Sequence, residues 1–107
     1  MSAAPPSYAV HDNREKDRFE IDLGDGGLAV AQYTLRKGKI SFTHTEVPTA
    51  YRGKGVGTLL IRTALASARA LGLKVIPICP FFAAYFVSHP DERDLLDPAY
   101  RKLLNLN

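Results

Sequence analysis

The stretch Tyr51-Arg52-Gly53-Lys54-Gly55-Val56-Gly57-Thr58 decides the fold, because its alternating glycines join a strand-like segment to a helix-like one. Before it, Ile40 to Val47 alternates as a half-buried strand does, and Pro48 ends that pattern. After it, apolar residues recur at helical spacing until Gly72. A glycine loop that opens a helix presents unpaired N–H groups and a partial positive charge, which attract phosphate.

The spacing of this loop separates it from two other phosphate-binding loops. A Walker A loop needs Lys and then Ser or Thr after its last glycine, whereas Gly57 is followed by Thr58 and Leu59. The dinucleotide fingerprint needs a third glycine five places after the first, whereas Gly53, Gly55 and Gly57 are evenly spaced. For the loop taken alone, a glycine-rich connection without a ligand remains an alternative.

The flanking patterns predict an α+β fold. Three alternating segments before the loop predict an antiparallel meander, and the segments after it add one strand and two further helices. The expected order β-β-β-α-β-α-α places helices on an antiparallel-dominated sheet. The expected strands cover 19–23, 28–35, 40–47 and 73–78, and the expected helices cover 56–71, 81–87 and 98–104.

Composition limits the architecture to one small domain. The chain has 107 residues, 46% of them hydrophobic, and 14 Lys and Arg against 11 Asp and Glu give a net charge of +3. These values exclude a disordered chain and a second core. We expect a flexible N-terminal tail over 1–7, a single domain over 8–107, and a solvated loop in the mixed-charge run 14–18.

Cysteine usage and hydropathy give an expectation about location. Cys79 is the single cysteine, which excludes a disulfide scaffold and fits a reducing compartment such as the cytoplasm. No stretch reaches the roughly 20 apolar residues of a membrane helix, and residues 1–7 do not read as a signal peptide. We therefore expect a cytoplasmic protein.

Four linked motifs resemble a known family. Arg52-x-x-Gly55-x-Gly57 on a strand–loop–helix resembles the acyl-CoA diphosphate loop of the GNAT N-acetyltransferase superfamily. With His44-Thr45-Glu46-Val47-Pro48, Pro77-x-Cys79-Pro80-Phe81-x-x-x-Tyr85 and His89-Pro90, the chain is similar to small single-domain YjdJ-type N-acetyltransferases. It departs from that pattern at Asp91-Glu92, where the pattern has Glu-Tyr. It also lacks the early helices and last strands that usually wall the acceptor pocket.

The resemblance implies a compact GNAT-like fold in which two central strands splay apart to admit the pantetheine arm of acetyl-CoA or coenzyme A. The open edge would be Thr45, Glu46 and Val47, facing a strand whose Pro77 has no N–H for a ladder. The diphosphate would lie on the loop and the start of the helix. The residues expected to bind the cofactor are Thr45, Val47, Arg52, Gly53, Lys54, Gly55, Val56, Gly57 and Thr58.

Acyl transfer to an amine needs a base, a proton donor for the leaving thiolate and a polarised carbonyl. Cys79 ends a strand and precedes a helix, so it could act as a thiolate nucleophile or be a small buried apolar residue. Tyr85 resembles the tyrosine that many GNAT enzymes use as general acid, or it packs on the sheet. His44 and Glu46 are expected beside Ile40 on one strand face, as bases or as structural and solvated side chains.

The leading hypothesis is an acetyl-CoA-dependent N-acetyltransferase, monomeric, acting on a small amine or an exposed protein amine. A non-catalytic acyl-CoA-binding module is the alternative. An adaptor that binds nucleic acid through scattered lysines and arginines is disfavoured, because they do not form a stripe with interleaved aromatics. No metal site is expected, since no His or Cys pair has ligand spacing. The basic residues weighed for the adaptor are Lys37, Lys39, Arg52, Lys54, Arg62 and Arg69.

Overall fold

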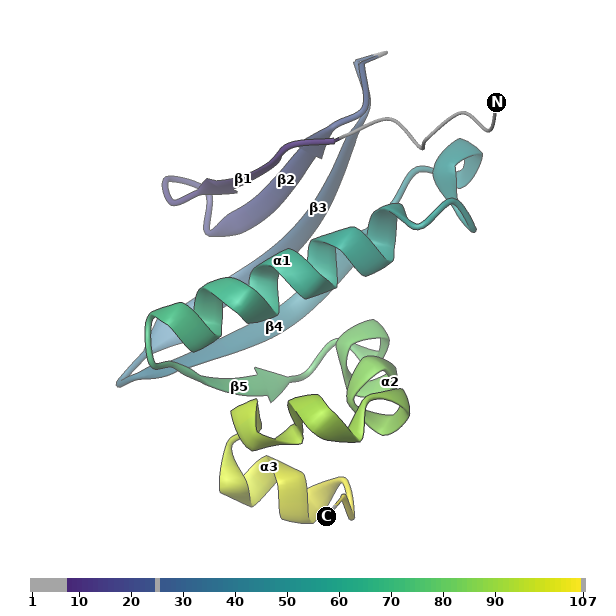
Figure 1. Cartoon of the computed structure of the whole chain (residues 1–107). Helices are drawn as coiled ribbons and strands as arrows, with labels where there is room; N and C mark the ends of the chain where they lie inside the picture. Colours follow the sequence, from purple (N-terminus) through teal and green to yellow (C-terminus); the bar gives the residue numbers. More distant parts are fainter. Residues whose placement is uncertain (1–7, 25, 107) are drawn as a thin grey trace.

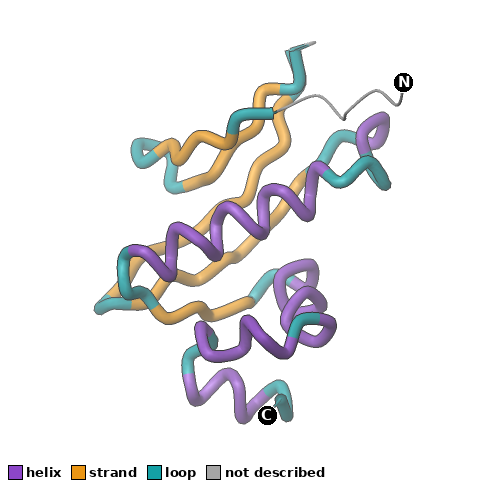
Figure 2. The backbone as a smooth tube through the Cα atoms, viewed as in Figure 1, coloured by secondary structure: helices purple, strands orange, loops and turns teal. Residues whose placement is uncertain are grey.

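Five strands form one sheet in chain order, with α1 (Val56–Ala70) lying across one face (Figures 1 and 2). The computed structural model describes residues 8–24 and 26–106. The first four strands are antiparallel and the fifth is parallel to the fourth, because α1 carries the chain back between them. The strands are β1 (Val10–Asn13), β2 (Arg18–Asp22), β3 (Leu28–Arg36), β4 (Lys39–Glu46) and β5 (Lys74–Pro77). The α+β class and the mostly antiparallel sheet are confirmed.

Short helices follow β5 and cluster beside it (Figure 1). Proline opens both α2 (Pro80–Ser88) and α3 (Pro98–Leu103), as expected from its fixed φ and missing N–H. Two 3₁₀ turns that the pattern did not indicate are η1 (Thr49–Tyr51) and η2 (Pro90–Leu95). Within the described residues, no helix is long and apolar enough to cross a membrane.

The element order expected from the sequence lacks β1. The solvated loop expected over 14–18 is wrong at Arg18, which is the first residue of β2. Val10 is the one aliphatic residue of β1, so no apolar alternation marks this strand in the sequence. Tertiary contacts hold it instead: Tyr33 Oη donates a 2.6 Å hydrogen bond to Asp12 Oδ1. The expected tail over 1–7 lies outside the described residues.

The hydrophobic core fills the space between the sheet and the helices. One face of α1 is buried at i, i+4 spacing, as the sequence pattern predicted. Phe42 of β4 stacks on Phe82 of α2 with ring centroids 4.1 Å apart, which fixes α2 against the sheet. The buried residues of α1 are Val56, Gly57, Leu60, Ile61, Ala64, Leu65 and Ala68.

A β-bulge in β4 changes which side chains face the core. Tyr33 pairs with Phe42, but the preceding Gln32 pairs with His44, so β4 carries one extra residue at this point. Thr45, opposite the buried Ala31, therefore shares the α1 side of the sheet with Phe42. The expectation that Ile40, Phe42, His44 and Glu46 share one face is wrong, because the bulge turns the last two to the other face.

The expected splay is present between β4 and β5. These strands pair over 39–42 and 74–77, and the last bond between them runs from Cys79 N to Phe42 O at 2.8 Å. β4 then continues to Glu46 without a described partner on that side. The splayed pair lies at the margin of the sheet rather than at its centre, because β5 is the outermost strand.

Candidate functional site

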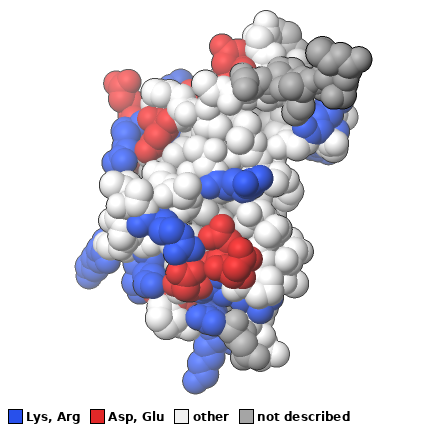
Figure 3. All heavy atoms as spheres, viewed as in Figure 1, with Lys and Arg blue, Asp and Glu red and all other residues white. Residues whose placement is uncertain are grey.

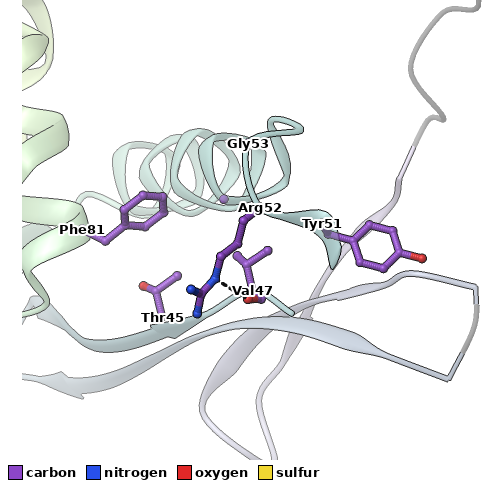
Figure 4. A pocket seen from close by; sticks show the side chains of 7 residues that line it. Thr45, Val47, Tyr51, Arg52, Gly53 and Phe81 are labelled. Carbon is purple, nitrogen blue, oxygen red and sulfur yellow. Dashed lines mark hydrogen bonds between the residues drawn. The ribbon is translucent and has the colours of Figure 1, made fainter. Parts of the chain in front are cut away.

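A cavity of about 400 Å³ opens where β4, the glycine loop, α1 and α2 meet (Figure 4). It lies at the open edge of β4, beyond the point where β5 diverges. Five of the nine residues expected to bind cofactor line it, and they come from both the strand and the loop. The residues that line it are Thr45, Val47, Tyr51, Arg52, Gly53, Gly57 and Phe81.

The loop leaves the start of α1 without a cap of its own. Gly55 is the N-cap residue at φ +83°, a left-handed conformation that glycine adopts without strain. It offers no side chain to the helix, and the first turn of α1 contains no acidic residue. The first helical bond runs from Leu59 N to Gly55 O, so the N–H groups of 56–58 have no acceptor within the helix. An anion here would gain about 0.3–1 kcal/mol from the helix dipole.

The four other expected cofactor residues do not line the cavity wall. Lys54 and Thr58 are exposed beside it, and Gly55 caps the helix. The side chain of Val56 is 2% exposed and belongs to the core, so only its N–H can face a ligand. These positions fit contact with an anion through backbone and charge rather than through an enclosing pocket.

Arg52 reaches across the mouth of the cavity. Its Nε donates a 3.3 Å hydrogen bond to the Val47 carbonyl oxygen, and its guanidinium points toward Thr45 (Figure 4). The side chain thus covers the open edge of β4 while keeping its charge exposed to solvent.

Phe81 forms a wall of the cavity that sequence analysis did not assign to the site. It is 44% exposed, and its ring rests against Gly57 of α1. Cζ and Cε2 of the ring lie 2.6 and 2.7 Å from where a Cβ on Gly57 would be, so only glycine fits while the ring is there. Its presence in the motif Pro77-x-Cys79-Pro80-Phe81, just past the splayed strand, was a signal that could have assigned it to the site.

Cys79 lies directly behind the cavity wall. It is 6% exposed, and its Sγ donates to Thr45 Oγ1 at 3.4 Å. It occupies the N-cap position of α2 as expected, but its side chain makes no capping bond there. The thiol is therefore next to a residue that lines the cavity, though it is not itself part of the lining described.

Tyr85 follows Phe81 by one turn of α2 and stacks on the His89 ring, with centroids 3.8 Å apart and planes 11° from parallel. His89 Nδ1 donates to the Tyr85 carbonyl oxygen at 2.8 Å, which fixes the orientation of the imidazole. Burial raises the pKa of Tyr85, and the nearby carboxylate of Glu92 raises it further. Tyr85 therefore keeps its proton at neutral pH.

His44 and Glu46 lie on the sheet face opposite α1. Their side chains are 57% and 61% exposed, and His44 Nε2 is 3.8 Å from Glu46 Oε1. The structure thus brings Cys79 next to Thr45, but it places His44 and Glu46 on the opposite face of the sheet. Among residues 8–24 and 26–106, no three His, Cys, Asp or Glu side chains gather where they could hold a metal ion.

Acidic and basic side chains are interspersed on the face that carries α1 (Figure 3). Arg69 pairs with Glu92 at 2.9 Å and with Asp94 at 2.7 Å, and Lys39 pairs with Asp97 at 2.8 Å. Two of the six basic residues weighed for nucleic-acid binding are thus matched by carboxylates, which disfavours a continuous basic stripe.

A strand that splays from its neighbour beside a glycine loop at a helix start is the arrangement that the sequence motifs implied. Residues 18–95 match the model of the GCN5-related N-acetyltransferase family. The chain belongs to this family.

Known proteins support this membership. The mouse protein NATD1 is 30% identical over 98 residues, which cover 82% of this chain and 88% of that protein. Human NATD1 is 31% identical over 88 residues, which cover 79% and 76%. An NMR structure of a GCN5-like protein from Staphylococcus aureus superposes with a TM-score of 0.67 at 25% identity, covering 83% of this chain and 87% of that one. The narrower YjdJ-type resemblance stays a prediction.

Proposed function

We propose that this protein is an acetyl-CoA-dependent N-acetyltransferase that acts on a small amine or an exposed protein amine. One observation carries the proposal: a single cavity joins an uncapped helix start to the unpaired edge of a strand. Coenzyme A has the matching chemistry, since its diphosphate carries an amide-containing arm.

The residues present fit both parts of such a ligand. The free N–H groups at the start of α1 suit a diphosphate, and the exposed Arg52 and Lys54 add positive charge at its rim. The open edge from Thr45 to Val47 suits the pantetheine amides, which would pair with it as a short added strand. The Phe81 ring supplies an apolar wall of the cavity.

In the proposed reaction, acetyl-CoA supplies an activated thioester carbonyl, and the acceptor amine forms the new C–N bond as the C–S bond breaks. Glu46 or His44 takes the amine proton at its side-chain oxygen or nitrogen. Tyr85 Oη holds a proton at neutral pH, which can pass to the leaving sulfur. His44 and Glu46 are exposed on the sheet face opposite α1, which supports entry of the acceptor amine from that face.

We propose direct transfer rather than an acetyl-Cys79 intermediate. The thiol is 6% exposed and bonded to Thr45 Oγ1, whereas a nucleophile needs an open approach to the carbonyl. Cys79 then serves to hold Thr45 in the cavity wall.

A non-catalytic acyl-CoA-binding module is the second candidate. It is favoured by one observation: Cys79, Tyr85, His44 and Glu46 are not among the described residues that line the cavity. Under this alternative the ligand site is retained without turnover.

Thermal melts with acetyl-CoA, CoA, ATP and NAD at matched concentrations test the ligand class. A ligand at 100 times its Kd adds about 2.7 kcal/mol, which is several degrees for a domain of this size. We expect a shift with acetyl-CoA and CoA but not with ATP or NAD. No shift with either coenzyme would overturn the proposal. A shift without thiol release across a panel of amines would instead support the binding module.

A further inference from the structure

The contact between Phe81 and Gly57 joins two helices across the mouth of the cavity. Gly57 is in the first turn of α1 and has helical backbone geometry, so its φ does not demand glycine. The space beside it is what demands glycine, since two ring atoms of Phe81 lie within 2.7 Å of a Cβ built there. Val47 Cγ2 is the next atom, at 3.6 Å, which is an ordinary contact.

The ring itself is poorly covered for an aromatic side chain beside a core. Its neighbour Phe82 is fully buried and stacked on Phe42, whereas Phe81 is 44% exposed and faces the cavity. Figure 4 shows the ring opposite the Arg52 side chain, with Thr45 below the space between them. The exposed ring face is thus presented to whatever passes between β4 and α1.

We propose that Phe81 is a specificity-determining wall for the pantetheine arm, and that Gly57 must be glycine to seat this ring rather than to admit the diphosphate. This inference rests on the proposed acyl-CoA site. The arm carries a dimethyl-substituted carbon and uncharged amides, which pack well on an aromatic face. Because the crowded atoms are at the far end of a side chain, a methyl group at 57 displaces the ring without disrupting the fold.

The test is a double-mutant cycle of Gly57→Ala and Phe81→Ala, read by calorimetric titration with two ligands. One ligand is CoA. The other is adenosine 3′-phosphate 5′-diphosphate, which keeps the phosphates and lacks the arm. We expect Phe81→Ala to weaken CoA binding about tenfold, as the loss of one aromatic contact would, and to change binding of the fragment less than about twofold.

The second arm of the cycle separates the two explanations of Gly57. Gly57→Ala should weaken CoA binding about tenfold when Phe81 is present and less than about twofold in the Phe81→Ala background. If Gly57→Ala lowers CoA affinity equally in both backgrounds, or lowers the affinity for the fragment as much as that for CoA, Gly57 faces the diphosphate and the inference is overturned. Unchanged CoA binding by Phe81→Ala would also overturn it.

Val87→Ala is the matched control, since Val87 is on the same helix, 57% exposed, and not in the cavity lining. It should bind both ligands as the unmodified protein does. Each variant is first checked for a cooperative melt, and Phe81→Leu should recover part of the CoA affinity. Failure of the unmodified protein to bind CoA would overturn the proposed function. If the unmodified protein binds CoA but the effects of the two substitutions on CoA affinity are additive, this inference alone is overturned.

Discussion

Arg52 Nε donates a 3.3 Å hydrogen bond to the carbonyl oxygen of Val47, at the far end of the unpaired β4 edge. That carbonyl is among the groups that a pantetheine amide N–H would use if the arm pairs with β4. The same guanidinium lines the cavity beside the loop, so under the proposed function it would contact the diphosphate. Under the proposed function, Arg52 would therefore compete with the pantetheine arm for this carbonyl and also contact the diphosphate.

Arg52→Ala should have opposite effects on two ligands. CoA affinity should fall about tenfold, because a charged contact to the diphosphate is lost. Affinity for pantetheine, which has no phosphate, should rise about two- to fivefold, because a competing hydrogen bond of roughly 0.5–1 kcal/mol is removed. Titration calorimetry measures the first and ligand-observed NMR the second. Arg36→Ala, remote from the cavity, is the control; a fall in affinity for both ligands would contradict the expectation.

Gly55→Asp should strongly weaken CoA binding, because it places a carboxylate at the start of α1, where the diphosphate would lie under the proposed function. Gly55→Asn is the matched control, because Asn is uncharged, nearly the same size and tolerates φ +83° about as well. Both variants should lose similar thermal stability, whereas only Asp should raise the CoA Kd by more than about 30-fold. Equal Kd values for the two would mean that backbone strain, not charge, governs binding.

Tyr85→Phe removes the hydroxyl and keeps the ring stacked on His89. If Tyr85 is the general acid, kcat should fall about 100-fold or more while the Kd of CoA changes less than about twofold. Steady-state kinetics and titration of the same preparation measure the two quantities. A kcat within about threefold of the original would leave Tyr85 as a packing residue.

The same assignment has a consequence for pH. Because burial and Glu92 raise the pKa of Tyr85, its proton should be retained beyond the ordinary tyrosine value of about 10. Glu92→Gln removes a negative charge near the hydroxyl, so the pKa of Tyr85 should fall and the alkaline limb of kcat should move to lower pH. Asp22→Asn, a remote exposed carboxylate, should leave that limb in place.

The glycine loop and its two flanks could be predicted because each depends on local pattern. A strand before Pro48, a helix after Gly55 and proline at the start of α2 are properties of short windows, and the structure confirms all three elements. The same local signals, together with the linked motifs, indicated the family from the sequence alone.

The side of the sheet that each β4 residue faces could not be predicted in this way. Strict alternation places His44 with Phe42, but the bulge opposite Gln32 and Tyr33 inserts one residue and reverses the order. A bulge is set by pairing with β3 and leaves no mark in the sequence of β4 alone. Phe81 was missed for a related reason, since its contact is with Gly57, which belongs to a different helix.

Cys79→Ser tests whether the thiol carries the acetyl group. Because Cys79 is buried behind Thr45, we expect turnover to stay within about tenfold of the original and no acetylated protein to appear in intact-mass spectra. Thr45→Val, which removes the hydroxyl that accepts from Sγ, should instead affect CoA binding, since Thr45 lines the cavity. A Cys79→Ser protein that binds CoA normally but has lost turnover would restore the covalent route.

Asp97 links α3 to β4 through an ion pair that should govern stability in acid. Its carboxylate is buried at 4% exposure and lies 2.8 Å from Lys39 Nζ, a hydrogen-bonded pairing that holds the pKa of Asp97 below its ordinary value. In the unfolded chain the pKa of an Asp side chain is about 3.9, and in the folded protein the pKa of Asp97 is lower. The ion pair therefore stabilises the fold at pH values above about 3.9, and this stabilisation is lost as the pH falls through the folded-state pKa. Asp97→Asn should therefore cost about 1–2 kcal/mol at pH 7 and progressively less below pH 4. Urea denaturation at several pH values measures the difference.

Lys39→Met should show the same trend, and the double variant should lose less stability than the sum of the two single losses. A constant loss of stability at every pH would mean that the ion pair does not set the acid limit.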